Sequence, residues 1–350
     1  MNDRISPKGQ LVLAGQYGSP YTLKMRAVLR YRRIPFQWML RDSKWDDLPT
    51  PPVPIIPVIA YPNADPTSED KYGDITVDSS PQIMRLETEY EGRSVVPPDP
   101  ALALIDWLIE DYGDEWTTKA MYHYRWAYEA DIDKAGKLLP LSSNLQMGSD
   151  QAQQSYEYIV DRQIGRRELV GSTELNQPII EGSYVRLLDI LQELTSSQDF
   201  FLGNRPGRGD FGIYGQLTQL VQWDPTSAAV AVDRAPKVSN WVSRVDDLSW
   251  LPVDEADWCS LEDLPAATRK LLSEIGATYA PFMVANAQAL MSGADEVVCE
   301  INGDTYRQGP FAYQAKCLHW LREQYVDLSD ADRERVDSVL DRTGCEQLFT

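Results

Sequence analysis

Hydrophobic and polar positions change their spacing along the first hundred residues. QLVLAG (10–15) reads as a strand, and in SPYTLKMRAVLRYRRI (19–34) Met25, Val28 and Leu29 form an apolar stripe that predicts a helix. PFQWMLR, VPIIPVIAYP and DITVD predict further strands, and SSPQIMRLETEY predicts a helix. This order of elements is typical of a small α/β domain.

After PPDP (97–100) the pattern becomes helical. Apolar residues recur every three or four positions in four segments that predict amphipathic helices, 102–116, 184–191, 213–221 and 238–248. Residues from about 135 to 180 are polar and weakly patterned, which predicts a long connection with broken helices. In the tail, Asn302-Gly303 between alternating runs predicts a hairpin, followed by two helices, the second opened by Ser329.

These patterns predict an α/β domain over 8–96, an all-helical domain over 97–275 and a C-terminal extension over 276–350. The hydrophobic fraction of 43% and the charged fraction of 25% suit a globular protein. The net charge of −20 disfavours binding to nucleic acid or to an anionic membrane. No apolar run is long enough to cross a bilayer, and MNDRISPKGQ lacks the apolar core of a signal peptide, so we expect a cytoplasmic protein.

The cysteines and histidines give no sign of a metal centre. Four cysteines lie in the last hundred residues without a CxxC pair, and the chain has two histidines. We therefore expect reduced thiols and no metal.

Three short stretches carry candidate chemistry, and each has an ordinary structural alternative. Ser19-Pro20 stands between a strand and a helix, where serine is a favoured N-cap and where a hydroxyl and the helix N-terminus could also stabilise a bound thiolate. In VPIIPVIAYP, a cis peptide before Pro57 would expose the backbone of Ile56 to an extended ligand, although a plain loop fits equally well. Asp78 and Ser79 precede a helix, either as caps or as partners of a ligand ammonium and carboxylate.

Together the three stretches resemble the thioredoxin-like domain of glutathione transferases, of the serine or cysteine type. FFLGNRPGRGDFGIYGQLTQL and APKVSNWVSRVDDL resemble two helices of that family's all-α C-terminal domain, and LIEDYGDEWTTKAMYHYRW resembles a longer bacterial branch. The similarity covers roughly residues 10 to 250. One departure is Gly207, which stands where the family's helix-capping motif has Ser or Thr, three residues before Asp210. The loop 62–74 is also longer than a tight turn.

The resemblance implies a role for each candidate. Ser19 would stabilise the glutathione thiolate, Ile56 before cis-Pro57 would pair with the cysteinyl part, and Asp78 and Ser79 would hold the γ-glutamyl end. Tyr17, near the same strand end, is a second candidate thiolate donor.

The second substrate is expected between the two domains. Tyr122, His123 and Trp126 could line an apolar pocket for an electrophile, although aromatic residues at helical spacing more often form core.

The resemblance implies an enzyme of detoxification that binds glutathione and a small electrophile, acts as a homodimer and needs no metal. The alternative is a noncatalytic binding or adaptor protein on the same fold, because a fold does not fix a function. Conjugation, dehalogenation, ether cleavage and isomerisation are not separated by the sequence.

Overall fold

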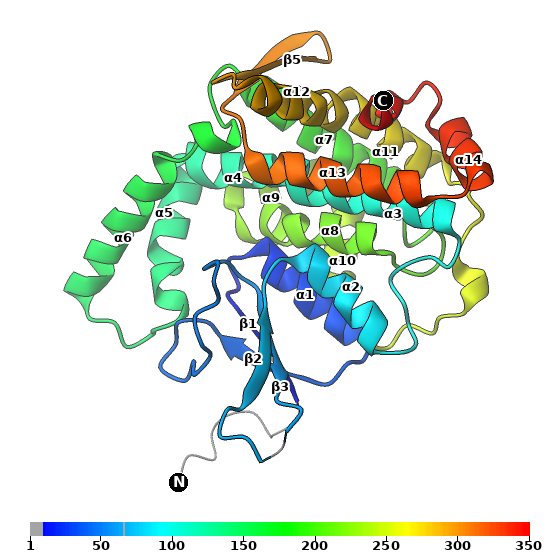
Figure 1. Cartoon of the computed structure of the whole chain (residues 1–350). Coiled ribbons are helices and arrows are strands. Elements are labelled where there is room, and N and C mark those ends of the chain that lie inside the picture. The colour runs from blue at the N-terminus through cyan, green and yellow to red at the C-terminus, as the bar shows by residue number, and fades with distance from the viewer. Residues whose placement is uncertain (1–9, 66) are drawn as a thin grey trace.

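The computed structural model describes residues 10–65 and 67–350, and its N-terminal part is built on a four-stranded mixed sheet (Figure 1). The strand order is β2-β1-β3-β4; β1 and β2 are parallel, and β3 is antiparallel to both of its neighbours. The strands are β1 (Leu11–Gly15), β2 (Phe36–Leu40), β3 (Val58–Pro62) and β4 (Tyr72–Thr76). The predicted strands are confirmed, and β4 begins two residues before the DITVD pattern.

The sheet is covered differently on its two faces because successive side chains of a strand point in opposite directions. Leu11 and Leu13 join the main core, and Val12 and Ala14 join a small second core with Val58. Helices α1 (Pro20–Tyr31) and α2 (Ser79–Glu89) lie between the sheet and the helical part of the molecule (Figure 1). This arrangement is the predicted thioredoxin-like domain followed by a helical region.

The remaining chain is mostly helical. Its helices before the extension are α3 (Pro100–Tyr112), α4 (Thr118–Ala127), α5 (Glu129–Leu138), α6 (Ser149–Ile164), α7 (Gln177–Leu194), α8 (Arg208–Leu217), α9 (Pro225–Arg234), α10 (Pro236–Val245) and α11 (Ala266–Ala277). A π-helical turn, Gly113–Thr117, joins α3 to α4. The prediction of broken helices over 135–180 is wrong for α6, which is one continuous helix. None of its residues is fully buried, and its apolar face is limited to the half-buried side chains of Ala152, Tyr156, Ile159 and Val160.

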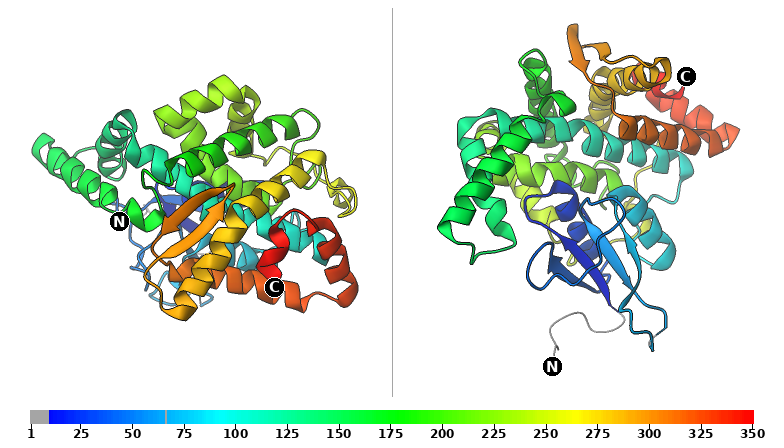
Figure 2. Two further views of the ribbon diagram at one scale, coloured as in Figure 1. Left: turned by 90° about the horizontal axis from the view of Figure 1, so that it is seen from above. Right: turned by 60° about the vertical axis from the view of Figure 1, so that its left-hand side comes forward.

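The C-terminal extension lies at the end of the molecule opposite the sheet (Figure 2). It comprises α12 (Tyr279–Ser292), the hairpin β5 (Val297–Ile301) and β6 (Asp304–Gln308), α13 (Ala312–Asp327) and α14 (Asp330–Leu340). The hairpin at Asn302-Gly303 is confirmed, and so is the cap of α14, where the Ser329 side chain accepts a hydrogen bond from the Asp332 N–H. Both α13 and α14 pack against α3.

The predicted boundaries at residues 97 and 276 stay predictions, because side chains from both sides of each belong to one continuous core. Residues 8 and 9 of the first predicted domain, and residue 66 of the loop 62–74, fall outside the described part of the chain. In the described part, no helix has both the length and the apolarity needed to cross a bilayer.

The start of α8 explains why glycine replaces the expected serine or threonine at position 207. Asp106, on α3, accepts hydrogen bonds from the N–H groups of Arg208 (3.0 Å) and Gly209 (2.9 Å). A Cβ at Gly207 would stand 2.3 Å from Asp106 Oδ1. The helix is therefore capped by a carboxylate of another helix, with Asp210 accepting from the Gly207 N–H as the motif predicts.

We expect Gly207→Ser to destabilise the protein although serine is ordinarily the better cap. The new Cβ would displace Asp106 from the helix start, and overpacking of this kind costs about 1–3 kcal/mol in free energy of unfolding. Gly148→Ser is the matched control: Gly148 is the N-cap of α6, and a Cβ there meets nothing within 4 Å. Denaturant unfolding of both variants checks this, and equal stabilities would contradict it.

Candidate functional site

Ser19 is the N-cap of α1, directly after β1. Its side chain accepts a hydrogen bond from the Thr22 N–H at 3.3 Å, and Pro20 is the first helical residue. The capping interpretation is therefore confirmed. It does not exclude the chemical one, because the hydroxyl accepts through a lone pair and its proton stays available to a thiolate.

The peptide bond between Ile56 and Pro57 is cis, as predicted. Ala14, near the end of β1, pairs with Val58 at the start of β3, so the cis-proline turn lies beside the strand end that leads to Ser19. Among the described residues, no hydrogen bond is made to the N–H or the C=O of Ile56. Its backbone is thus available to an extended ligand.

Asp78 has a backbone conformation that non-glycine residues rarely adopt, with φ 77° and ψ 112°. Such conformations are enriched at ligand-binding positions. Asp78 occupies the N-cap position of α2, but its side chain makes no capping hydrogen bond. The interpretation of its carboxylate as a helix cap is therefore wrong. Asp78 Oδ2 instead accepts a hydrogen bond from the Tyr313 hydroxyl of α13, at 2.7 Å.

The side chains after Asp78 point into a buried cluster of charged groups. Lys24 Nζ donates to Ser79 Oγ (3.1 Å) and forms ion pairs of 2.6 Å with Glu110 and with Asp114. Burial lowers the pKa of Lys24, but the attraction of Asp114 and Glu110 outweighs burial and raises that pKa overall. Burial raises the pKa of Asp114 to about 6 despite Lys24. Lys24 therefore stays charged and fixes the start of α2 against α1.

Two further side chains hold the three stretches together. Gln82 of α2 donates through Nε2 to the carbonyls of Pro57 (3.3 Å) and Thr76 (2.9 Å). Arg125 of α4 donates through Nη1 to the carbonyl of Gly18 (2.9 Å), next to Ser19. The N-terminal ends of α1 and α2 and the cis-proline turn are thus held together by hydrogen bonds, one of which comes from α4 in the helical part.

Tyr17 faces a different side of β1. Its ring packs against Trp38 of β2, with centroids 5.5 Å apart, and the guanidinium of Arg26 lies over it. The sheet order places β2 and the cis-proline turn before β3 on opposite sides of β1. The structure therefore brings Ser19, Ile56, Pro57, Asp78 and Ser79 together and sets the Tyr17 ring apart from them.

The three candidates for the second-substrate pocket lie on α4 and have partners of their own. His123 is buried, with Nδ1 2.8 Å from Ser172 Oγ and Nε2 3.1 Å from Glu181 Oε1. Burial lowers the pKa of His123, which favours its neutral form. Trp126 is also buried. Tyr122 is half-buried and donates to the carbonyl of Gln163. Of the three, Tyr122 has the most exposed side chain.

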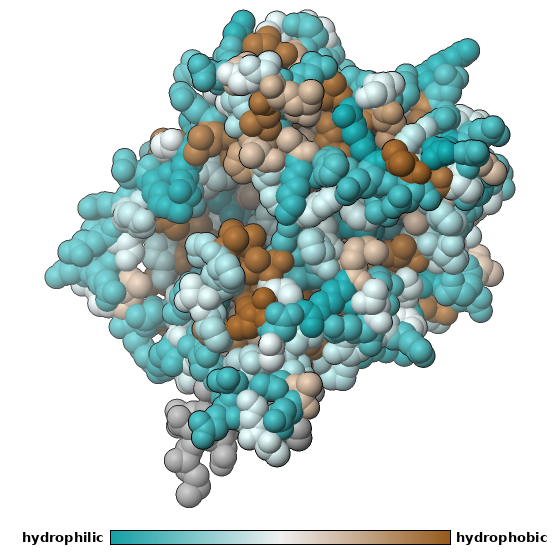
Figure 3. All heavy atoms as spheres, in the orientation of Figure 1, coloured by the Kyte–Doolittle hydropathy of each residue, from teal (hydrophilic) through white to brown (hydrophobic). Residues whose placement is uncertain are grey.

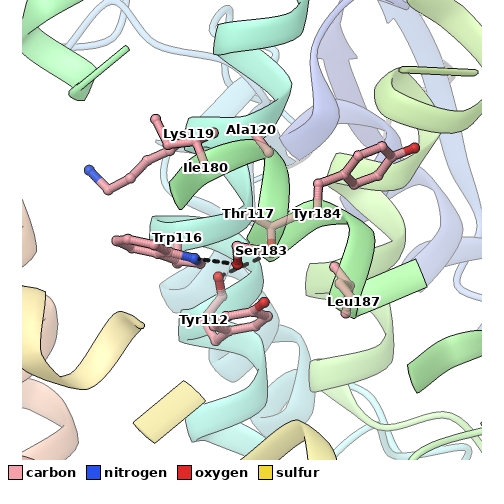
Figure 4. Close-up of a pocket in the computed structure, with 9 residues that line it drawn as sticks. All are labelled: Tyr112, Trp116, Thr117, Lys119, Ala120, Ile180, Ser183, Tyr184 and Leu187. Carbon is pink, nitrogen blue, oxygen red and sulfur yellow. Dashed lines mark hydrogen bonds between the residues drawn. The ribbon is translucent and has the colours of Figure 1, made fainter. Parts of the chain in front are cut away.

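The molecular surface is hollowed where the N-terminal domain meets α4 and the start of α13, and hydrophobic side chains gather below the hollow (Figure 3). A separate small cavity of about 10 Å³ lies between the π-helical turn and α7 (Figure 4). It has room for about one water molecule. None of its lining residues is a predicted site residue, so this cavity is no substrate pocket.

Sequence reasoning missed Lys24, Glu110, Asp114, Arg125 and Tyr313. A lysine among the apolar positions of α1, and acidic residues in the apolar run LIEDYGDEW, were available signals. Polar groups on a buried face require partners, so these positions indicated a buried network.

Comparison with known proteins identifies the N-terminal part. Residues 13–94 match the family model described as glutathione S-transferase, N-terminal domain. No curated protein sequence matches the chain.

Three of the solved structures similar to this chain are two glutathione S-transferases and a beta-etherase. A Tau class glutathione S-transferase from mango is 19% identical and covers 71% of this chain and 96% of its own, with a TM-score of 0.41. A glutathione S-transferase from Methylobacterium radiotolerans, in complex with glutathione sulfonate, is 18% identical and covers 70% of this chain and 98% of its own, with a TM-score of 0.36. A beta-etherase from a Sphingobium strain is 16% identical and covers 68% of this chain and 95% of its own, with a TM-score of 0.43.

Proposed function

We propose that this chain, whose residues 13–94 match the glutathione S-transferase N-terminal domain, binds glutathione and activates its thiol for attack on an electrophilic carbon. The observation that carries this proposal is the convergence of three ligand-ready features: the Ser19 hydroxyl, the unpaired backbone of Ile56 beside cis-Pro57, and the start of α2 at Asp78.

The γ-glutamyl end of glutathione binds at α2. Within the described residues, the Asp78 side chain makes no capping hydrogen bond, so the N–H groups of the first turn of α2 donate to the ligand carboxylate. The Asp78 carboxylate receives the ammonium group. The cysteinyl backbone pairs with Ile56, which directs the thiol toward the start of α1.

The thiol binds as a thiolate. The positive end of the α1 dipole favours the anion, and the Ser19 hydroxyl donates a hydrogen bond to the sulfur. The sulfur then uses a lone pair to form a bond to carbon, and the leaving group departs with the electrons of the broken bond. Because Ser19 has no sulfur, a mixed disulfide at this position is excluded.

The electrophile enters the hollow between the N-terminal domain and α4 (Figure 3). Tyr122, the most exposed of the three candidates on α4, is the candidate contact. Conjugation, dehalogenation, ether cleavage and isomerisation all begin with the same thiolate. A detoxifying role, a cytoplasmic location and a homodimer complete the proposal and rest on the family resemblance alone.

The test is retention of the full chain on immobilised glutathione, followed by turnover of a panel of electrophiles. Retention with turnover supports the proposal. Retention without turnover of any electrophile favours the adaptor alternative, and failure to bind glutathione contradicts both.

We expect Ser19→Ala to lower turnover by at least about tenfold, because a hydrogen bond to a charged group contributes roughly 1.5–3 kcal/mol. Ser329→Ala is the matched control, since it removes a capping hydroxyl from α14, far from the site. Steady-state kinetics and the pH profile of thiol ionisation check this. An unchanged profile in Ser19→Ala would exclude Ser19 as the thiolate donor.

A further inference from the structure

A second group of buried side chains lies where the extension meets α3. Asp111 lies in the last turn of α3, Glu115 lies in the π-helical turn that follows, and Cys317 lies on α13. Each offers one ligand atom, and the three atoms lie within 4.8 Å of one another. All three residues are buried, so this group is shielded from water.

No ion pair compensates the two carboxyl groups of this cluster within the described residues. Within the described chain, no lysine or arginine forms an ion pair with Asp111 or Glu115, whereas Lys24 is committed to Glu110 and Asp114. Lys119 Nζ, the cation that acts on Glu115, donates to Gln308 Oε1 at 2.6 Å. Two neighbouring carboxylates in a buried site repel each other unless one of them takes up a proton or a cation lies between them.

Unpaired polar atoms beside the group point to a ligand. Gln314 lies one turn before Cys317 on α13, and its Nε2 donates to the Glu115 carbonyl at 3.2 Å. Its amide also faces the Glu115 carboxyl. Gln314 Oε1 is buried and has no partner in the described structure, and the same holds for Asp114 Oδ1. Such atoms are rare in native proteins and require an explanation.

The carboxylate of Asp111 is also oriented by a hydrogen bond from a residue outside the group. The Tyr279 hydroxyl of α12 donates a hydrogen bond to Asp111 Oδ2. Partners of this kind orient the ligands of metal sites.

We propose that Asp111, Glu115 and Cys317 bind one divalent cation, Zn²⁺, with Gln314 Oε1 as the candidate fourth donor. The thiolate favours zinc over magnesium or calcium, and two carboxylates with a thiolate balance its charge with one negative charge in excess. On binding, the Cys317 thiol releases its proton to water. Because Cys317 lies on α13 and the carboxylates on α3 and the following turn, the ion joins the extension to the helical domain.

The sequence predicted no metal because it shows no CxxC pair. That rule detects ligands that are close in sequence, whereas here the fold brings together Cys317 and an Asp–Glu pair one helical turn apart. The proposal does not rest on the proposed glutathione binding, although Cys317 lies close enough to Asp78 to interact with its charge.

The experiment uses the full chain without an affinity tag, treated with a chelator and then titrated with Zn²⁺ by calorimetry, and with Co²⁺ by absorbance. We expect one equivalent to bind, a thiolate-to-cobalt charge-transfer band, and a higher melting temperature with Zn²⁺. Cys317→Ser should abolish the band, and Asp111→Asn should weaken Zn²⁺ binding at least about tenfold.

Cys259→Ser is the matched control, since Cys259 lies outside the group and its substitution should leave the band unchanged. Circular dichroism of the metal-free variants verifies that each is folded; should Cys317→Ser not fold, Asp111→Asn decides the matter. The proposal is overturned when the unsubstituted chain binds no Zn²⁺, when Cys317→Ser and Asp111→Asn bind it as tightly as the unsubstituted chain, or when only Mg²⁺ or Ca²⁺ binds.

Discussion

Replacing Asp78 by alanine is expected to weaken glutathione binding by about ten- to a hundredfold. The carboxylate is proposed to hold the ligand ammonium, and a hydrogen bond between charged groups contributes roughly 1.5–3 kcal/mol. Its Oδ2 atom is held by Tyr313, so the group is already oriented when the ligand arrives. Ser79→Ala should weaken binding less, because its hydroxyl bonds to Lys24 and backbone N–H groups can hold the ligand carboxylate.

Three further variants separate the charge of Asp78 from its hydrogen bond to Tyr313 and from a general effect of removing acidic charge. Asp78→Asn tolerates the positive φ and removes only the charge. Tyr313→Phe should weaken binding about three- to tenfold, as expected for a neutral hydrogen bond. Asp70→Ala removes an acidic charge from an exposed loop and should leave affinity unchanged. Isothermal calorimetry and thermal melting are measured on each, and an Asp78 variant that melts earlier but binds normally would remove Asp78 from the site.

Lys24→Met is expected to lower the free energy of unfolding by about 3–5 kcal/mol. Lys24 is fully buried, and it is the only cation paired with Asp114 within residues 10–65 and 67–350. Removing one partner of a buried pair leaves an uncompensated charge, and this costs more than the pair itself contributes. Glu110 would still form its ion pair with Arg208, so Asp114 is the carboxylate that would lose its cation.

Lys44→Met is the control, since Lys44 is exposed and donates to Gln146 at the surface. Adding Asp114→Asn to Lys24→Met should recover part of the loss, because the unpaired charge is then gone. Urea unfolding measures all three proteins. A loss below about 1 kcal/mol for Lys24→Met would show that water or a rearranged side chain compensates Asp114.

Local sequence patterns were sufficient to predict the elements that bury one face. The strands, α1, α2, the hairpin and the cap of α14 all follow from period, turn residues or capping residues within a few positions. Helix α6 was not predicted as one continuous helix because its apolar face, Ala152, Tyr156, Ile159 and Val160, is short and only half-buried among polar residues. The cap of α8 was only half predicted, since its second carboxylate comes from Asp106 on another helix.

The candidate site divides in the same way. Ser19, cis-Pro57 and Asp78 were found because each sits at a junction between a strand and the next element. The partners that hold them were not found because they are distant in sequence: Glu110 lies 86 positions from Lys24, and Asp114 lies 90. A pattern can show that a buried lysine needs a partner, but it does not show which carboxylate the fold supplies.

The contact between Asp78 and Tyr313 also orders events during synthesis. The two residues are separated by 235 positions, and ribosomes add roughly 5–20 residues per second, so Tyr313 is made roughly ten to fifty seconds after Asp78. Throughout that interval the strands and helices of the N-terminal domain can fold, while the phenol that orients the acidic anchor does not yet exist. A nascent chain is therefore structurally able to form the proposed thiol-activating end before the proposed ammonium-binding end is complete, because Tyr313 is supplied only when the C-terminal extension is made.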